Sequence, residues 1–119
     1  MPKIKISIIG AGFVGMSLAA LLSKSHDVRV LDIDESKVNK INTRKSTIDD
    51  PDVAEVLKSK NLNLYATTRP EEALDDSNFV FIATPTKFDE SLNLFDTTSV
   101  EESIQASLEL SNPQSLIII

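Results

Sequence analysis

The chain has 119 residues, of which 41% are hydrophobic and 25% charged, as is typical of one soluble globular domain and not of a disordered segment. Twelve basic residues are dispersed among eighteen acidic ones, for a net charge of −6, so we expect no concentrated basic face for nucleic acid. The absence of cysteine and the single histidine exclude a disulfide scaffold, a thiolate metal site and a histidine-rich metal cluster.

The two ends of the sequence give further expectations. Met1 to Lys5 lack the apolar core of a signal peptide, and no apolar run approaches the roughly 20 residues that cross a bilayer. We therefore expect a cytoplasmic location and no membrane partner. The last residues, 116–119, are all apolar, which favours a domain (1–119) that is part of a longer chain.

In chain order, strand and helix patterns alternate. Strands are predicted over Lys3–Ile9, Val28–Asp32, Leu62–Ala66, Asn78–Ala83 and Ser115–Ile119. Helices are predicted over Phe13–Lys24, after Asp34, from Pro51, from Pro70, and from Thr97 or Thr98 to about Leu110, with loops at Asn42–Asp50 and Thr84–Asp96. This order predicts an α/β fold: a Rossmann-like, doubly wound parallel sheet of about five strands with helices on both faces.

Two of these helices carry apolar stripes. In the first, Val14, Leu18, Leu21 and Leu22 fall on one face at helical spacing, and we expect that face to meet the sheet. In the second, Asp34 is the expected N-cap, and Val38 and Ile41 are three residues apart.

All three glycines of the chain form one motif, Gly10-Ala11-Gly12-Phe13-Val14-Gly15, or G-x-G-x-x-G. The motif lies at the end of the first predicted strand and opens the first helix, which is the setting that dinucleotide binding requires. Gly10 is expected to permit the tight turn, Gly12 to let the backbone approach a pyrophosphate, and Gly15 to let helix and strand pack closely. Amides at the helix N-terminus would then receive the phosphates.

An acidic residue ends the second predicted strand. Asp32 follows Gly10 by 22 residues (32 − 10 = 22), close to the spacing of about 20 at which a carboxylate receives the adenosine ribose hydroxyls. The same carboxylate would repel the 2′-phosphate of NADP, so the cofactor is predicted to be NAD. Asp34 is an alternative for this role, and Lys37 either lines the adenosine pocket or is a solvated helix lysine.

Thr84-Pro85-Thr86 follows the fourth predicted strand directly. Ligands of open parallel sheets bind beyond the carboxyl ends of the strands, near the point where the strand order reverses. The two hydroxyls could therefore contact a dinucleotide, although a rigid loop is an equal alternative.

Together these residues resemble the N-terminal domain of the UDP-glucose/GDP-mannose dehydrogenase family. The resemblance rests on Ile8 to Gly15, Asp32-Ile33-Asp34 with Lys37-Val38, Lys40-Ile41-Asn42, Ala66-Thr67-Thr68 and Phe81 to Thr86. Leu94-Phe95-Asp96-Thr97, with Val100-Glu101, looks most like the UDP-glucose 6-dehydrogenase branch. The similarity covers essentially the whole chain.

The resemblance implies the cofactor half of an enzyme that oxidises the C6 hydroxyl of a UDP-sugar to a carboxylate, using two NAD and a cysteine-bound thioester. It implies that NAD is contacted by Gly10, Ala11, Gly12, Phe13, Val14, Gly15, Asp32, Lys37, Ala83, Thr84 and Thr86. It also implies that the catalytic residues, the connecting helix and the sugar-nucleotide domain lie outside this chain, and that the parent enzyme is a homodimer. The fragment alone is then expected to be inactive.

The same residues leave other functions open. The substrate could be UDP-N-acetylmannosamine or GDP-mannose, because residues that touch the sugar are not expected within 1–119. A regulatory module of the same fold could sense NAD, NADH or an adenine nucleotide without catalysis. An S-adenosylmethionine domain is disfavoured, because its ligand needs no pyrophosphate cradle.

Overall fold

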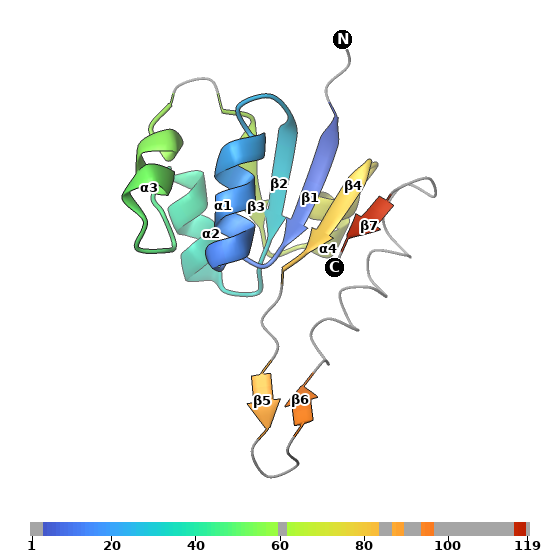
Figure 1. Ribbon diagram of the computed structural model, residues 1–119. Helices are drawn as coiled ribbons and strands as arrows, with labels where there is room; N and C mark the ends of the chain where they lie inside the picture. Colours follow the sequence, from blue (N-terminus) through green and yellow to red (C-terminus); the bar gives the residue numbers. More distant parts are fainter. Residues whose placement is uncertain (1–3, 60–61, 84–86, 90–93, 97–115, 119) are drawn as a thin grey trace.

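The structure is a computed structural model that describes residues 4–59, 62–83, 87–89, 94–96 and 116–118 (Figure 1). Within these residues the strands are β1 (Lys5–Ile9), β2 (Asp27–Leu31), β3 (Leu64–Thr67), β4 (Phe79–Ile82), β5 (Lys87–Asp89), β6 (Leu94–Asp96) and β7 (Leu116–Ile118). The helices are α1 (Phe13–Leu22), α2 (Glu35–Asn42), α3 (Pro51–Leu57) and α4 (Pro70–Leu74). The helix expected between Thr97 and Leu110 lies outside the described residues.

Five of the described strands form one sheet in the order β3-β2-β1-β4-β7, and every neighbouring pair is parallel. This confirms the predicted Rossmann-like α/β class. In the register of the central strands, Ile8 lies beside Val30 of β2 and Phe81 of β4. The loop expected over Thr84–Asp96 was wrong in part, because β5 and β6 form a separate antiparallel pair there.

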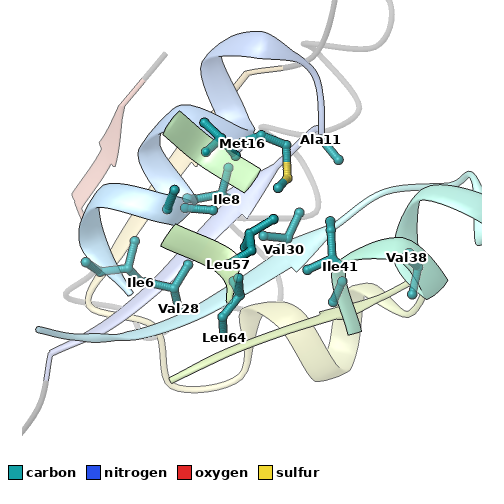
Figure 2. Close-up of a cluster of buried hydrophobic side chains, with 14 residues drawn as sticks. Ile6, Ile8, Ala11, Met16, Val28, Val30, Val38, Ile41, Leu57 and Leu64 are labelled. Atoms are coloured by element: carbon teal, nitrogen blue, oxygen red, sulfur yellow. The ribbon is translucent and has the colours of Figure 1, made fainter. Parts of the chain in front are cut away.

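Helices cover both faces of the sheet. On one face, side chains of β1 and β2 pack against α1, α2 and α3, and Figure 2 shows Ile6, Ile8, Val28 and Val30 as members of this cluster. The opposite face has its own cluster, formed by Ile9, Leu31, Ala73, Leu74, Val80 and Ile82. Ala73 and Leu74 belong to α4, which therefore lies on the side of the sheet away from α1.

The face of α1 that meets the sheet agrees with the predicted one only in part. Leu18 and Leu22 pack against the main core cluster as predicted. In contrast, Val14 and Leu21 are largely exposed, at 64% and 65%, whereas Met16 and Ala19 are fully buried. The buried residues of α1 are Gly15, Met16, Ala19 and Ala20. At Gly15 the helix approaches the end of β1 so closely that a Cβ would collide with backbone, whereas the longer side chain of Met16 is accommodated and fully buried.

Side-chain caps begin α2 and α3. The Asp34 carboxylate accepts a hydrogen bond from Ser36 N, as the sequence predicts, and Asp50 accepts from the amides of Asp52 and Val53. Pro51 occupies the first turn of α3, where its missing N–H has no cost. At the other end of α2, Asn42 pairs with both backbone groups of Ala66 in β3.

A buried polar row crosses the α4 face of the sheet. Ser7 of β1 is paired in register with Arg29 of β2, and both are buried. The Ser7 hydroxyl contacts the Ala73 carbonyl and the Ser77 hydroxyl. Arg29 donates from Nη1 to the Asp75 carbonyl at 2.8 Å. These bonds tie α4 and the following turn to the two central strands.

None of the helices in the described parts of the chain combines the length and apolar character that spanning a membrane requires.

Candidate functional site

The site lies where the strand order of the main sheet reverses. The chain runs from β1 outward to β2 and β3, and then returns to β4 on the other side of β1. The switch point therefore falls between β1 and β4, at whose carboxyl ends ligands of this class of sheet bind. The glycine motif follows β1 directly, and the Ala83 amide donates to the Ile9 carbonyl at 2.8 Å, which places the end of β4 beside the motif.

Gly10 makes the turn out of β1. Its φ is 107°, in the left-handed region that side chains disfavour. Its amide donates to the Leu31 carbonyl at 2.8 Å, so the turn begins while the chain is still paired with β2. The predicted task of Gly10, a tight change of direction, is confirmed.

Gly12 and Gly15 have opposite surroundings. A Cβ at Gly15 would lie 1.8 Å from the Gly10 carbonyl oxygen, so any side chain there would collide with the backbone of the preceding turn. A Cβ at Gly12 would have nothing within 4 Å. Gly15 therefore serves close helix–strand packing, as predicted, and the space beside Gly12 is open to an approaching group.

The N-terminus of α1 lies at Gly12, the residue beside this open space. Gly12 is the N-cap residue, and as a glycine it makes no side-chain capping hydrogen bond. The first bond of the helix runs from Met16 N to Gly12 O at 2.9 Å, so the amides before Met16 precede the helical ladder. Such amides, together with the positive end of the helix dipole, suit a phosphate or another anion.

Asp32 connects the end of β2 to the glycine motif. One carboxylate oxygen accepts from the Ala11 amide at 2.9 Å, and the other accepts from the Asp34 amide at 2.9 Å. The side chain is only partly buried. Because each carboxylate oxygen can accept two hydrogen bonds, both retain capacity for the hydroxyls of a ribose.

Of the other predicted residues, four lie within the described residues and two lie outside them. Phe13 and Val14 begin α1 with side chains that are 66% and 64% exposed, and Lys37 is half-buried in the first turn of α2, shortly after Asp32. Ala83 is partly buried beside β1. Thr84 and Thr86 lie outside the described residues.

Sequence reasoning missed one residue of the site. Thr47, in the segment between α2 and α3, donates its hydroxyl to the Ala11 carbonyl at 2.7 Å. The segment has no recognisable motif, and the two residues are 36 positions apart, so no local signal could have identified the contact.

These features define a class of protein. A parallel sheet with the glycine motif at its switch point, open space at Gly12 and a carboxylate at the end of β2 is a dinucleotide-binding α/β domain.

Comparison with known proteins gives the family. The description "UDP-glucose/GDP-mannose dehydrogenase family, NAD binding domain" matches residues 4–119. The chain belongs to this family and is its NAD binding domain, as the sequence resemblance indicated.

Three known proteins illustrate the relationship. The UDP-glucose 6-dehydrogenase of Streptococcus pneumoniae is 44% identical over 114 residues, which are 96% of this chain and 29% of that enzyme. A ternary complex of GDP-mannose dehydrogenase from Pseudomonas aeruginosa superposes with a TM-score of 0.79 at 30% identity, covering 86% of this chain and 24% of that one. For the UDP-D-ManNAc dehydrogenase of Pyrococcus horikoshii the TM-score is 0.83 at 26% identity, covering 96% and 27%. The chain thus spans less than a third of the length of each relative.

Proposed function

We propose that residues 1–119 act as one cofactor domain, which holds NAD at the carboxyl edge of the sheet for a UDP-glucose 6-dehydrogenase. The proposed contacts are Gly10, Ala11, Gly12, Phe13, Val14, Gly15, Asp32, Lys37, Ala83, Thr84 and Thr86. The parent enzyme would oxidise the C6 hydroxyl of UDP-glucose, and we propose that it acts as a homodimer. NAD supplies the hydride acceptor when it is bound, and the residues of this chain bind and orient it.

The observation that carries the proposal is the arrangement around Ala11 and Gly12. The Asp32 carboxylate receives the Ala11 amide at 2.9 Å, while the adjoining Gly12 faces open space. The residue that bonds the Asp32 carboxylate, Ala11, is thus next in sequence to Gly12. A carboxylate that could receive a ribose therefore lies close to backbone that a diphosphate could approach. This spacing suits the adenosine diphosphate half of NAD.

The choice of sugar nucleotide rests on relatedness. Compared by sequence, two bacterial UDP-glucose 6-dehydrogenases are 44% and 40% identical to this chain, and a GDP-mannose 6-dehydrogenase of Pseudomonas syringae is 36% identical. GDP-mannose and UDP-N-acetylmannosamine stay as alternatives within the same proposal, because the cofactor site would be the same for all three substrates.

The first test measures NAD binding by calorimetry for the unsubstituted chain and for Gly12→Val. The valine would project into the open space, so we expect NAD affinity to fall by at least tenfold, while the thermal unfolding temperature changes little. The φ of −87° at Gly12 suits any residue.

Ser17→Val is the matched control, because Ser17 is exposed on α1 beyond the loop. It should retain the affinity of the unsubstituted chain. An unsubstituted chain that releases no heat with NAD+ or NADH would refute the proposed cofactor site. Equal affinity of Gly12→Val would show that the open space at Gly12 is not where the diphosphate passes.

A further inference from the structure

We infer that Thr47 is a positioning residue for the cofactor loop, which it holds in the orientation that presents the Gly12 amide to a diphosphate. The inference deepens the proposed function and rests on it. Neither the glycine motif nor the acidic residue that follows it includes Thr47, which belongs to the segment between α2 and α3.

The first step concerns the two sides of Ala11. Its amide donates to Asp32 at 2.9 Å, and its carbonyl accepts from the Thr47 hydroxyl at 2.7 Å. Ala11 itself is 1% exposed. Both peptide groups that flank this residue are therefore fixed by side chains from other parts of the chain, one from the end of β2 and one from the segment before α3.

The second step follows from the planarity of the peptide bond. In a trans peptide the carbonyl of one residue and the amide of the next point in opposite directions. The peptide that joins Ala11 to Gly12 is trans, since the described chain contains no cis peptide bond. When Thr47 holds the Ala11 carbonyl, the Gly12 N–H must point away from the Thr47 segment. Without this bond, the orientation of the peptide plane would depend on the torsion angles of Ala11 and Gly12, and glycine rotates easily.

The third step is that Thr47 is itself held firmly. Ser46 donates its hydroxyl to the Ile48 carbonyl at 2.7 Å and receives the Ile48 amide at 3.1 Å, so the two neighbours of Thr47 are joined across it. Ile48 packs against the main core cluster. Asp50, two residues further on, caps α3. The hydroxyl of Thr47 is therefore presented from an ordered turn that is anchored in the core and at a helix.

The test compares two substitutions at one position. Thr47→Val keeps the shape of the side chain and removes the hydroxyl, whereas Thr47→Ser keeps the hydroxyl. Because one hydrogen bond contributes roughly a factor of five, we expect Thr47→Val to weaken NAD+ binding about fivefold and Thr47→Ser to bind nearly as the unsubstituted chain does. Adenosine shares the base and ribose of NAD+ but has no phosphate, so its affinity, measured by NMR titration, should be the same in all three proteins.

Thr43→Val is the matched control, because Thr43 donates to the carbonyls of Asn39 and Lys40 at the end of α2 and does not contact the glycine loop. Its NAD+ affinity should not change. Three results would overturn the inference: equal NAD+ affinity of Thr47→Val and the unsubstituted chain, an equal loss for adenosine and NAD+, or a similar loss in Thr43→Val. Failure of the unsubstituted chain to bind NAD+ would instead refute the proposed function and, with it, the role of Thr47.

Discussion

The glycines of the loop after β1 meet different steric demands, although they lie within six residues. Gly10 needs its positive φ of 107°, and Gly15 needs to have no Cβ because the Gly10 carbonyl occupies that position. Gly12 has an ordinary φ of −87° and free space around it. Folding therefore constrains Gly10 and Gly15 directly, while the demand at Gly12 comes from what binds beside it.

Gly15→Ala should lower the free energy of unfolding by about 3 kcal/mol, because the added methyl group would force α1 away from the end of β1. The contact is with backbone, at 1.8 Å, and backbone cannot move aside as a flexible side chain can. Urea unfolding measures the change. Gly12→Ala is the control and should alter stability by less than about 0.5 kcal/mol. Similar stabilities of the two variants would contradict the close approach at Gly15.

Asp32→Ala should weaken NAD binding by more than tenfold and NADP binding by much less, so the preference for NAD narrows. Asp32 would offer its remaining hydrogen-bonding capacity to the ribose and repel a 2′-phosphate. The substitution also frees the amides of Ala11 and Asp34, which adds to the loss for both cofactors. Calorimetry with each cofactor gives the ratio.

The Asp34→Ala variant distinguishes the role of Asp34 from that of Asp32. Asp34 accepts from Ser36 N at 2.9 Å as the cap of α2, so its loss should cost about 1 kcal/mol of stability and leave the NAD/NADP ratio unchanged. If substitution of Asp34, and not of Asp32, changed the NAD/NADP affinity ratio, then Asp34 would be the carboxylate that receives the ribose.

For individual residues, what the sequence could predict depends on how many positions separate the two residues in contact. The tasks of Gly10 and Gly15 follow from a spacing of five residues within one turn, and the Asp34 cap bonds a residue two positions away. The hydrogen bonds that Asp32 and Thr47 make to Ala11 join residues 21 and 36 positions apart. Such contacts depend on how strand and loop pack together, which no local pattern records.

Among the secondary-structure elements, α1 illustrates why an apolar stripe can predict a buried face only in part. Ser17 is the one polar residue between Phe13 and Leu22, so apolar residues lie on every side of the helix and periodicity hardly distinguishes its faces. The close approach at Gly15 leaves no room for a Cβ at that position, and the buried residues of the helix are Gly15, Met16, Ala19 and Ala20.

The buried face of α1 can be tested by truncating one residue on each side. Met16 is fully buried, so Met16→Ala should lower the free energy of unfolding by about 2–5 kcal/mol. Leu21 is 65% exposed, so Leu21→Ala should change it by less than about 0.5 kcal/mol. Both variants insert alanine into the same helix, which keeps helix propensity matched. If urea unfolding showed a larger loss of unfolding free energy for Leu21→Ala than for Met16→Ala, Leu21 would belong to the buried face, as periodicity predicted.

Elements that obey simple alternation or capping were predictable, and those that depend on partners were not. β1, β2 and β4 follow apolar patterns that their burial in a parallel sheet explains. The pairing of β5 with β6 was missed because each strand has only three residues, too few for a periodic signal. Asn42 was expected to begin a polar loop, yet it ends α2 and bonds both backbone groups of Ala66 on the outermost strand, β3. That bonding requires the folded sheet and leaves no mark in the sequence.

For the whole molecule, topology brings distant segments together at one edge. The order β3-β2-β1-β4-β7 places the ends of β1, β2 and β4 side by side, so residues 10–15, 32 and 83 meet although up to 73 positions separate them (83 − 10 = 73). The alternation of strands and helices was sufficient to predict this edge, because right-handed crossovers leave few other arrangements.

On the proposed function, the same edge would hold the cofactor for one half of a reaction. Oxidation of a sugar alcohol by NAD requires the C6 carbon to be held against the nicotinamide, and alignment of this kind supplies much of the rate. The family resemblance further implies a cysteine that carries the acyl intermediate, and this chain contains no cysteine. Cofactor binding and catalysis should therefore separate cleanly in this chain.

The 119-residue chain, mixed with NAD+ and UDP-glucose, should accumulate no NADH above the rate of the protein-free mixture. NADH absorbance measures this, and calorimetry on the same preparation establishes that NAD+ is bound. The full-length UDP-glucose 6-dehydrogenase of Streptococcus pneumoniae, assayed in parallel, shows that the conditions support turnover. Bound NAD+ without NADH formation would fit a domain that positions the cofactor and leaves the sugar to other residues. Sustained NADH formation would mean that this chain aligns the sugar by itself and oxidises it without a thiolate.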